Sequence, residues 1–158
     1  MGRELLVLWA GRHRRDDWER ICARYRKRIG RQVPLRELVI RPRSGGEGPE
    51  RRRAEGEALL AALPDPCWSV ALDRRGEMRS SEKLAAWLGR LRAEWPHPIA
   101  FLIGSDLGLP DFVRDQVRER LSFGPLTLPH ELARVVLYEQ LYRSLSMAAG
   151  IKYHRKPL

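Results

Sequence analysis

An α/β fold, with a mostly parallel sheet flanked by helices, is the fold class that the sequence predicts. Short apolar runs of strand length alternate with segments of helical spacing, which is the order of repeated βαβ units. Apolar runs of this kind are typical of parallel strands that are covered on both faces. The chain has 158 residues, and no internal repeat or long linker divides it. We therefore expect a single domain over residues 1–158.

The first strand is predicted at residues 5–10, LLVLWA. A helix should follow, because Asp16 and Glu19 have the spacing of a capping box and Gly30 suits its C-terminal end. The apolar face of this helix would carry Trp18, Ile21, Cys22, Tyr25 and Ile29. Its other face is basic and carries Arg20, Arg24, Lys27, Arg28 and Arg31. This face could bind RNA phosphates, or it could be an ordinary solvated surface.

The middle of the chain continues the alternation. Three further strands are predicted at residues 35–40, 68–72 and 99–103. A Gly- and Pro-rich loop over 41–50 leads into a helix over 50–63, which Pro64 and Pro66 end. Ser80 or Ser81 can cap the next helix. Its apolar positions indicate core packing: Leu84, Trp87, Leu88, Leu91 and Trp95.

The C-terminal part places two glycine- and proline-bearing loops close together in sequence. Residues 104–108, GSDLG, follow the fourth strand, and residues 121–130, LSFGPLTLPH, open a long helix from His130 to about Ala149. Core contacts are expected from Leu132, Val135, Val136, Leu141 and Leu145. Apolar residues beside that face widen the arc, which indicates a subunit interface: Leu137, Tyr138 and Tyr142.

Composition favours a polyanionic partner, nucleic acid above all. The net charge is +10, of which +8 falls in residues 1–56 and +3 in residues 152–158. A basic protein without such a partner is the alternative. Cys22 and Cys67 are isolated, which predicts reduced thiols and no metal site. No apolar run approaches the length of a membrane span, so we expect a cytoplasmic protein with no membrane contact.

Common ligand motifs are absent. The GSDLG loop lacks the third glycine of a dinucleotide fingerprint, and the chain has neither a P-loop nor a GxSxG elbow. Ligands of open α/β sheets bind outside the carboxyl ends of the strands. Three segments should lie there and could form the walls of a small-molecule pocket: 72–76, 104–108 and 123–128.

Four motifs together resemble the RlmH family of SPOUT-class methyltransferases. They are IGSDLG, LSFGPLTLPH, RVVLYEQLYR and the terminal YHR, and the resemblance is strongest over residues 101–155. Ser105 departs from the pattern, because the family usually has a second glycine there. The family methylates N3 of a pseudouridine in 23S rRNA on the 70S ribosome. The resemblance implies a SPOUT fold with a deep C-terminal trefoil knot, a homodimer with a shared substrate site, and bound S-adenosylmethionine.

Site residues follow from the same resemblance. Carried over by motif, the cofactor contacts would be Leu72, Gly104, Phe123, Gly124, Pro125, Leu126, Thr127 and Leu128. The catalytic candidates are Arg143, to orient the base or stabilise negative charge, Tyr153, to stack on or hydrogen-bond the base, and His154, to assist proton removal. Lys152, Arg155 and Lys156 would hold phosphates. The alternatives to these functional roles are that Arg143 only caps the last turn of its helix and that the tail is disordered. His130, in the first turn of the same helix, could likewise be structural.

Two other functions remain open. One is a SPOUT methyltransferase that acts on another RNA, such as tRNA. The other is a non-catalytic RNA- or ribosome-binding factor that keeps the same fold.

Overall fold

The computed structural model describes residues 4–12, 16–41 and 46–155. Strands and helices alternate through these ranges. In chain order the elements are β1 (Leu5–Trp9), α1 (Asp17–Gly30), β2 (Leu35–Val39), α2 (Gly48–Ala61), β3 (Trp68–Met78), α3 (Ser81–Glu94), β4 (Ile99–Ile103), α4 (Asp111–Gln116), β5 (Glu119–Ser122) and α5 (His130–Ala148).

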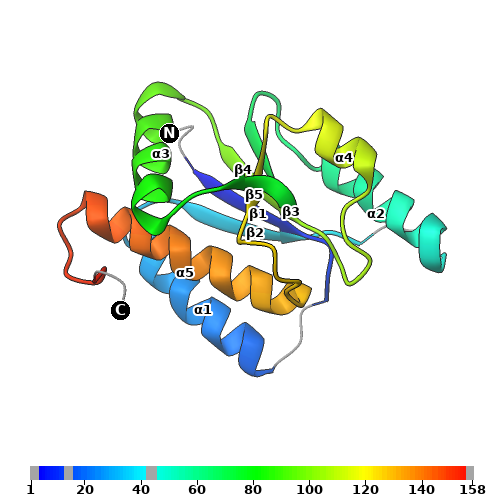
Figure 1. Ribbon diagram of the computed structural model, residues 1–158. Coiled ribbons are helices and arrows are strands. Elements are labelled where there is room, and N and C mark those ends of the chain that lie inside the picture. The colour runs from blue at the N-terminus through cyan, green and yellow to red at the C-terminus, as the bar shows by residue number, and fades with distance from the viewer. Residues whose placement is uncertain (1–3, 13–15, 42–45, 156–158) are drawn as a thin grey trace.

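The strands form one sheet in the order β2-β1-β4-β3-β5 (Figure 1). Leu5 of β1 is level with Leu35 on one side and with Ile99 on the other. All pairings among the described strands are parallel, which confirms the predicted α/β class. The carboxyl ends of the strands therefore share one edge of the sheet, where ligands of such sheets bind.

Helices cover both faces of the sheet (Figure 1). α1, α3 and α5 lie on one face, and their buried side chains pack around Phe101. α2 and α4 lie on the other face, where Leu59 and Val113 pack against Leu102. The central strands β1 and β4 are thus buried on both faces, which explains why they are continuously apolar.

β3 and β5 correct the predicted sheet. β3 continues to Met78, six residues beyond the predicted end at Leu72, and β5 was not predicted as a strand at all. The two strands pair with each other, with an irregularity between Leu72 and Glu77. Gly76 permits this pairing, because a Cβ there would lie 2.6 Å from the carbonyl carbon of Arg120. The trefoil knot implied by the family resemblance stays a prediction.

Helix ends follow the predicted capping residues. The Asp16 side chain accepts a hydrogen bond from the Glu19 amide at 3.0 Å, and Ser80 accepts one from the Lys83 amide at 3.2 Å. α2 begins at Gly48, two residues before the predicted start. α1 ends at Gly30, but its C-cap residue is Arg31, whose backbone has the right-handed helical conformation. The helix therefore does not end with a glycine in the left-handed conformation.

The inward face of α5 differs from the prediction. Leu137, Tyr138 and Tyr142, which were assigned to an outer arc, are buried in the core beside Leu141 and Leu145. Of the predicted core residues Leu132, Val135 and Val136, all are half-buried, and Val135 packs against the core. Arg134 lies on the inward face, where carboxylates from α1 and β2 neutralise it.

Candidate active site

A pocket of about 180 Å³ lies between the middle of β3, at residues 72–74, and the loop that follows β5. Six of the eight predicted cofactor residues line it: Leu72, Phe123, Gly124, Leu126, Thr127 and Leu128. Asp73, Arg74, Leu121 and Ala133 complete the lining. The remaining two candidates, Gly104 and Pro125, do not line it. The pocket walls are therefore mostly apolar, as in sites that bury a flat ligand.

The loop over residues 123–128 is anchored at its start by the side chain of Ser122. The Ser122 hydroxyl donates to the Arg74 carbonyl at 2.9 Å and accepts from the Gly124 amide at 3.0 Å. Gly124 has a φ of 112°, a conformation that L side chains rarely adopt. The loop thus presents main chain rather than large side chains near this point of the pocket.

Ser105, the residue that departs from the family pattern, has defined partners. Its hydroxyl donates to Glu55 of α2 at 2.6 Å and accepts from the Leu107 amide at 3.2 Å. Gly104 beside it is tightly enclosed, since a Cβ there would lie 2.8 Å from the carbonyl carbon of Gly108. The 104–108 loop therefore accommodates a serine by bonding it to α2.

A larger cavity of about 520 Å³ opens at the ends of β1, β2 and β4. Arginines and carboxylates share its lining, and Arg51 donates to Asp106 at 2.7 Å. His130 also lines it and packs on the Trp9 ring, with centroids 6.0 Å apart. This cavity was not predicted from the sequence, although polar residues follow the first two strands and could have indicated it.

The three predicted catalytic residues meet in one cluster at the C-terminal end of α5. Arg143 Nη1 lies 3.0 Å from His154 Nδ1, and the Arg143 guanidinium lies 4.9 Å from the centre of the Tyr153 ring. The tail after α5 therefore folds back onto the helix. Of the tail's predicted phosphate-binding residues, Lys152 and Arg155 are exposed, and Lys156 lies outside the described residues.

Glu139 organises this cluster, and the sequence argument did not identify it. Its Oε1 accepts from Arg143 Nη2 at 2.6 Å, from Arg143 Nε at 3.0 Å and from the Tyr153 hydroxyl at 3.1 Å. Because Tyr153 donates its only proton there, Tyr25 of α1 is the donor in the 3.1 Å contact between the two hydroxyls. The glutamate of the EQ pair, four residues before Arg143, was the available signal.

Two further helices hold the tail in place. Arg28 of α1, predicted on the basic face, lies 4.1 Å above the Tyr142 ring and donates to its hydroxyl at 3.1 Å. Tyr142 in turn packs edge-on against Tyr153, with centroids 4.8 Å apart. From α3, Glu82 Oε1 lies 3.0 Å from His154 Nε2. Residues from three helices thus define the position of the tail.

The cluster changes the acidity of its members. Burial raises the pKa of the Tyr153 hydroxyl, and the nearby Glu139 carboxylate raises it further. The hydrogen bond to Glu139 raises the pKa of Arg143. Tyr153 therefore stays a protonated phenol, and Arg143 stays cationic.

A second charged network fixes the N-terminal half of α5. Arg134, which is 1% exposed, donates from Nε and Nη2 to the two oxygens of Glu37 at 2.8 and 2.5 Å. It also donates to Glu19 at 2.6 Å and lies 4.3 Å from the centre of the Trp9 ring. Burial and the Glu37 carboxylate raise the pKa of Tyr138, which donates to Glu37. This network ties the helix after the cofactor loop to α1 and β2.

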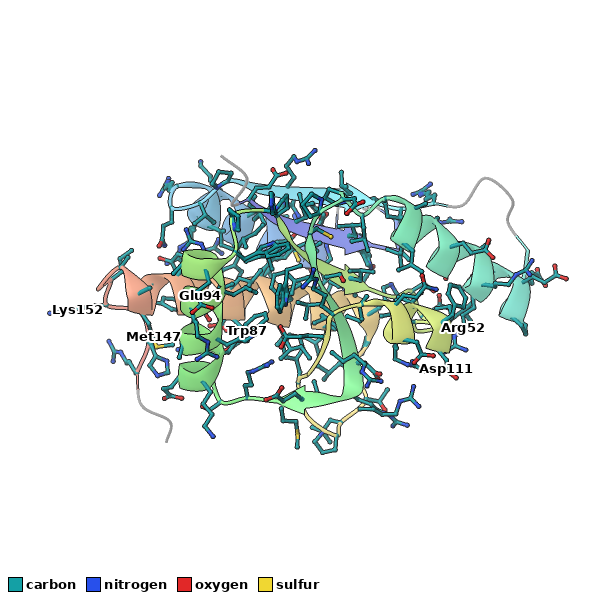
Figure 2. The ribbon with its side chains drawn as sticks, turned by 90° about the horizontal axis from the view of Figure 1, so that it is seen from above. Arg52, Trp87, Glu94, Asp111, Met147 and Lys152 are labelled. Atoms are coloured by element: carbon teal, nitrogen blue, oxygen red, sulfur yellow. The ribbon has the colours of Figure 1, made fainter. Side chains whose placement is uncertain are left out.

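Residues 123–128 precede the N-terminal end of α5, and the tail follows its C-terminal end (Figure 1). Ala133, which lines the pocket, and Arg143 are ten residues apart, which is about 15 Å at the helical rise of about 1.5 Å per residue. In Figure 2, Met147 and Lys152 lie at one end of the molecule, far from Arg52 and Asp111 at the other. The pocket and the tail cluster are therefore two separate features of the chain.

No group of three or more His, Cys, Asp or Glu side chains in the described part could hold a metal ion. Within the same ranges, no helix is long and apolar enough to cross a bilayer.

Comparison with known proteins settles the family. The model of a family described as predicted SPOUT methyltransferase matches residues 4–154. The chain belongs to the SPOUT methyltransferase family. This membership agrees with the parallel sheet and with a pocket at its carboxyl edge, and it makes the protein an enzyme of the methyltransferase class.

Relatives of this SPOUT protein match over almost their full length. It is 42% identical over 151 residues to the ribosomal RNA large subunit methyltransferase H of Rhodospirillum centenum, covering 94% of this chain and 98% of that protein. It is 39% identical to the protein of the same name from Solidesulfovibrio magneticus, covering 95% of this chain and 97% of that one. The predicted resemblance to the RlmH family is thereby confirmed.

Solved structures show the same fold at lower identity. A probable methyltransferase from Bordetella pertussis Tohama I aligns with a TM-score of 0.58 at 17% identity, covering 91% of this chain and 95% of that one. A structure described in connection with 2-OH methylation of C/U34 on tRNA aligns with a TM-score of 0.50 at 22% identity, covering 92% and 98%. Both likenesses concern the SPOUT fold alone.

Proposed function

We propose that the protein methylates N3 of a pseudouridine in 23S rRNA on the assembled 70S ribosome, with S-adenosylmethionine as methyl donor. Family membership and relatives named ribosomal RNA large subunit methyltransferase H support this. The observation that carries it is the cluster around Glu139, which brings Tyr153 and His154 of the terminal YHR motif onto Arg143. Because ribosomes are the substrate, the enzyme would act in the cytoplasm.

The pocket between β3 and the loop that follows β5 suits S-adenosylmethionine. Leu72, Leu121 and Leu128 offer apolar walls to an adenine ring, and the bare backbone at Gly124 can approach it closely. Gly104 and Pro125, which do not line the pocket, would act by shaping their loops. When bound, S-adenosylmethionine supplies a methyl group that its sulfonium already activates. The remaining task of the chain is to place the nucleophile in line.

The tail cluster supplies groups for the target base. N3 of pseudouridine has to lose a proton, which leaves negative charge on the ring. Arg143 is placed to orient the base or to stabilise that charge, since it stays cationic. Tyr153 suits stacking or hydrogen bonding, because its raised pKa keeps its proton in place. His154 borders the same region.

A homodimer would bring the cofactor pocket of one protomer and the tail cluster of its partner together in one active site. Two α5 helices packed antiparallel around a two-fold axis would put the tail of one protomer beside the cofactor loop of its partner. Met78 and Leu126, which are 66% and 77% exposed, supply apolar surface near that loop. Val136 on α5 is half-buried and lines a hollow with Met78. An apolar surface of this kind supports self-association.

The basic face of α1 suits the phosphates of a ribosome. Arg24, Lys27 and Arg31 are exposed and form no ion pair within the described ranges. Lys152 projects from the tail at the end of the molecule (Figure 2) and could add a contact beside the active site. Much of the affinity would then come from phosphate contacts, which depend strongly on salt.

Transfer of labelled methyl from S-adenosylmethionine to 70S ribosomes that lack the modification tests the function. Naked 23S rRNA and tRNA serve as parallel substrates, and mass spectrometry identifies the product nucleoside. We expect label on ribosomes alone, recovered as 3-methylpseudouridine. Label on tRNA would overturn the substrate but keep the enzyme class. Absence of label despite cofactor binding would favour a binding factor.

A further inference from the structure

His154 is held between two charged groups that fix its ring. Its Nδ1 lies 3.0 Å from Arg143 Nη1, and its Nε2 lies 3.0 Å from Glu82 Oε1. The side chain is 17% exposed, so neither ring nitrogen is simply turned toward solvent. The chemistry of these two partners determines where the ring carries its proton.

Arg143 can only donate hydrogen bonds, because a guanidinium has five N–H groups and no acceptor. Nδ1 of His154 must therefore accept, and in the neutral ring the proton lies on Nε2. Glu82 provides the matching acceptor, since a carboxylate only accepts. A doubly protonated ring would turn an N–H toward the Arg143 N–H. The geometry thus selects the neutral ring with its hydrogen on Nε2.

Arg143 cannot easily turn away from this contact. Its Nε and Nη2 both donate to Glu139 Oε1, at 3.0 and 2.6 Å. With two nitrogens of the planar guanidinium bound on one side, Nη1 is directed at the ring. The charged groups that face His154 are therefore Arg143 from α5 and Glu82 from α3.

We propose that Glu82 is a positioning residue that, with Arg143, holds His154 in the Nε2–H form, and that His154 serves as a hydrogen-bond donor rather than as the base. The lone pair of Nδ1 is already engaged by Arg143, so no ring nitrogen is free to take a proton. This inference rests on the proposed function and concerns the tail end of the same active site.

Glu82 also marks where the target base would sit. Its side chain is 53% exposed, so its contact with His154 is only partly shielded from water and can be exchanged for another acceptor. A carbonyl oxygen next to N3 of pseudouridine is such an acceptor. When N3 loses its proton, negative charge spreads onto that oxygen, and Nε2–H would then donate to it as an oxyanion-hole group does.

The methylation step balances with water as the proton acceptor. A water molecule takes the N3 proton, and the N3 electron pair forms a bond to the methyl carbon. The carbon–sulfur bond breaks, and its electron pair stays on sulfur, so that the positive sulfonium and the negative base both become neutral. His154 gains and loses no proton in this sequence.

Nitrogen NMR on the free protein tests the tautomer without any methyl transfer. Histidine ring nitrogens are labelled with ¹⁵N, and His154 is assigned by the loss of its signals in His154→Gln. We expect a neutral ring with hydrogen on Nε2 at about pH 8, where an unperturbed imidazole is neutral. A ring with hydrogen on Nδ1, or a cationic ring at that pH, would overturn the proposal. Both outcomes are readable even if the protein methylates nothing.

Glutamine and asparagine variants of His154 test the donor role. A glutamine amide can donate from the position of Nε2 but cannot act as a base, whereas asparagine is too short to reach it. We expect His154→Gln to keep turnover within about tenfold of the wild type, and His154→Asn and His154→Ala to lose about 100-fold or more. Equal losses in all three variants, with the cofactor still bound, would support a base and sink the donor role.

Glu82 is tested by replacement and rescue. Glu82→Ala should lower turnover by about threefold to tenfold and broaden the His154 Nε2–H signal through exchange with water. Glu82→Gln, whose amide oxygen can still accept, should restore both. Glu94→Ala is the matched control, because Glu94 is an exposed glutamate near the other end of α3 (Figure 2). An unchanged signal and unchanged turnover in Glu82→Ala would remove Glu82 from the site.

Discussion

Arg134 and Glu37 form a two-pronged ion pair beneath the N-terminal half of α5, with N–O distances of 2.8 and 2.5 Å. Both side chains are at least 95% buried. The pair links the helix that follows the cofactor loop to the second strand of the sheet. A buried pair of this kind is sensitive to the loss of one partner, because the other charge remains in a poorly solvating environment.

Replacing Arg134 by Met should therefore destabilise the fold. We expect the free energy of unfolding, measured by urea denaturation, to fall by about 3–5 kcal/mol, because Glu37 and Glu19 lose their shared cation. Arg24→Met, at an exposed position of α1, is the control, and its free energy of unfolding should stay within about 0.5 kcal/mol of the wild-type value. An Arg134→Met variant as stable as this control would contradict the importance of the network.

Acid should weaken the same network through Glu19. Burial opposes ionisation, but hydrogen bonds from Arg26 and Arg134 outweigh it and lower the pKa of Glu19 below the usual 4.5. A lowered folded-state pKa stabilises the protein above the unfolded-state value, and this contribution is lost as pH falls through the folded-state value. Unfolding measured between about pH 6 and 3 should thus show a shallower decline in Glu19→Gln than in the wild type. Parallel curves would argue against this role.

Substitutions near the two ends of α5 should affect cofactor binding and turnover separately. His154→Ala should lose about 100-fold or more in turnover and leave binding of S-adenosylmethionine unchanged, since Ala133 of the pocket and Arg143 of the tail cluster lie about 15 Å apart along the helix. Gly124→Val should weaken binding itself, because its φ of 112° strains any side chain. Isothermal titration calorimetry measures the affinity. Loss of cofactor binding in His154→Ala would place the tail in the pocket of its own chain.

Mixed dimers should reveal whether the active site is shared. A chain with Gly124→Val keeps an intact tail, and a chain with His154→Ala keeps an intact pocket. Random mixing gives about half heterodimers, each with one complete site between protomers, so activity should return to about a quarter of the wild-type value. If each chain used its own tail, the mixture would be no more active than the two parent variants.

Ribosome binding should weaken steeply with salt. Removing two phosphate contacts with Arg24→Ala and Lys27→Ala should reduce the slope of log affinity against log salt by about 1.5, since each contact contributes about 0.7–0.9. Arg90→Ala, at an exposed position of α3, removes the same charge as Arg24→Ala and is the control for each single substitution. A flat salt response of the wild type would rule out phosphate contacts as the main source of affinity.

The sequence by itself determined the elements whose signals are local. The apolar runs of β1, β2 and β4 and the helix starts at Asp16 and Ser80 depend on neighbouring residues, so periodicity and capping identified them. The carboxyl edge of the sheet followed from strand order, and the family motif indicated six residues that line a pocket there; that they bind a cofactor stays a prediction.

Tertiary structure decided what depends on partners distant in sequence. β5 and the second half of β3 exist because they pair with each other, and no local pattern encodes that pairing. Arg134 is buried because Glu19 and Glu37 meet it from two other elements. Glu139 and Glu82 gain their roles only when the tail folds back across α5 and α3. A polar group can be buried where its partners converge, and only the folded chain brings these together.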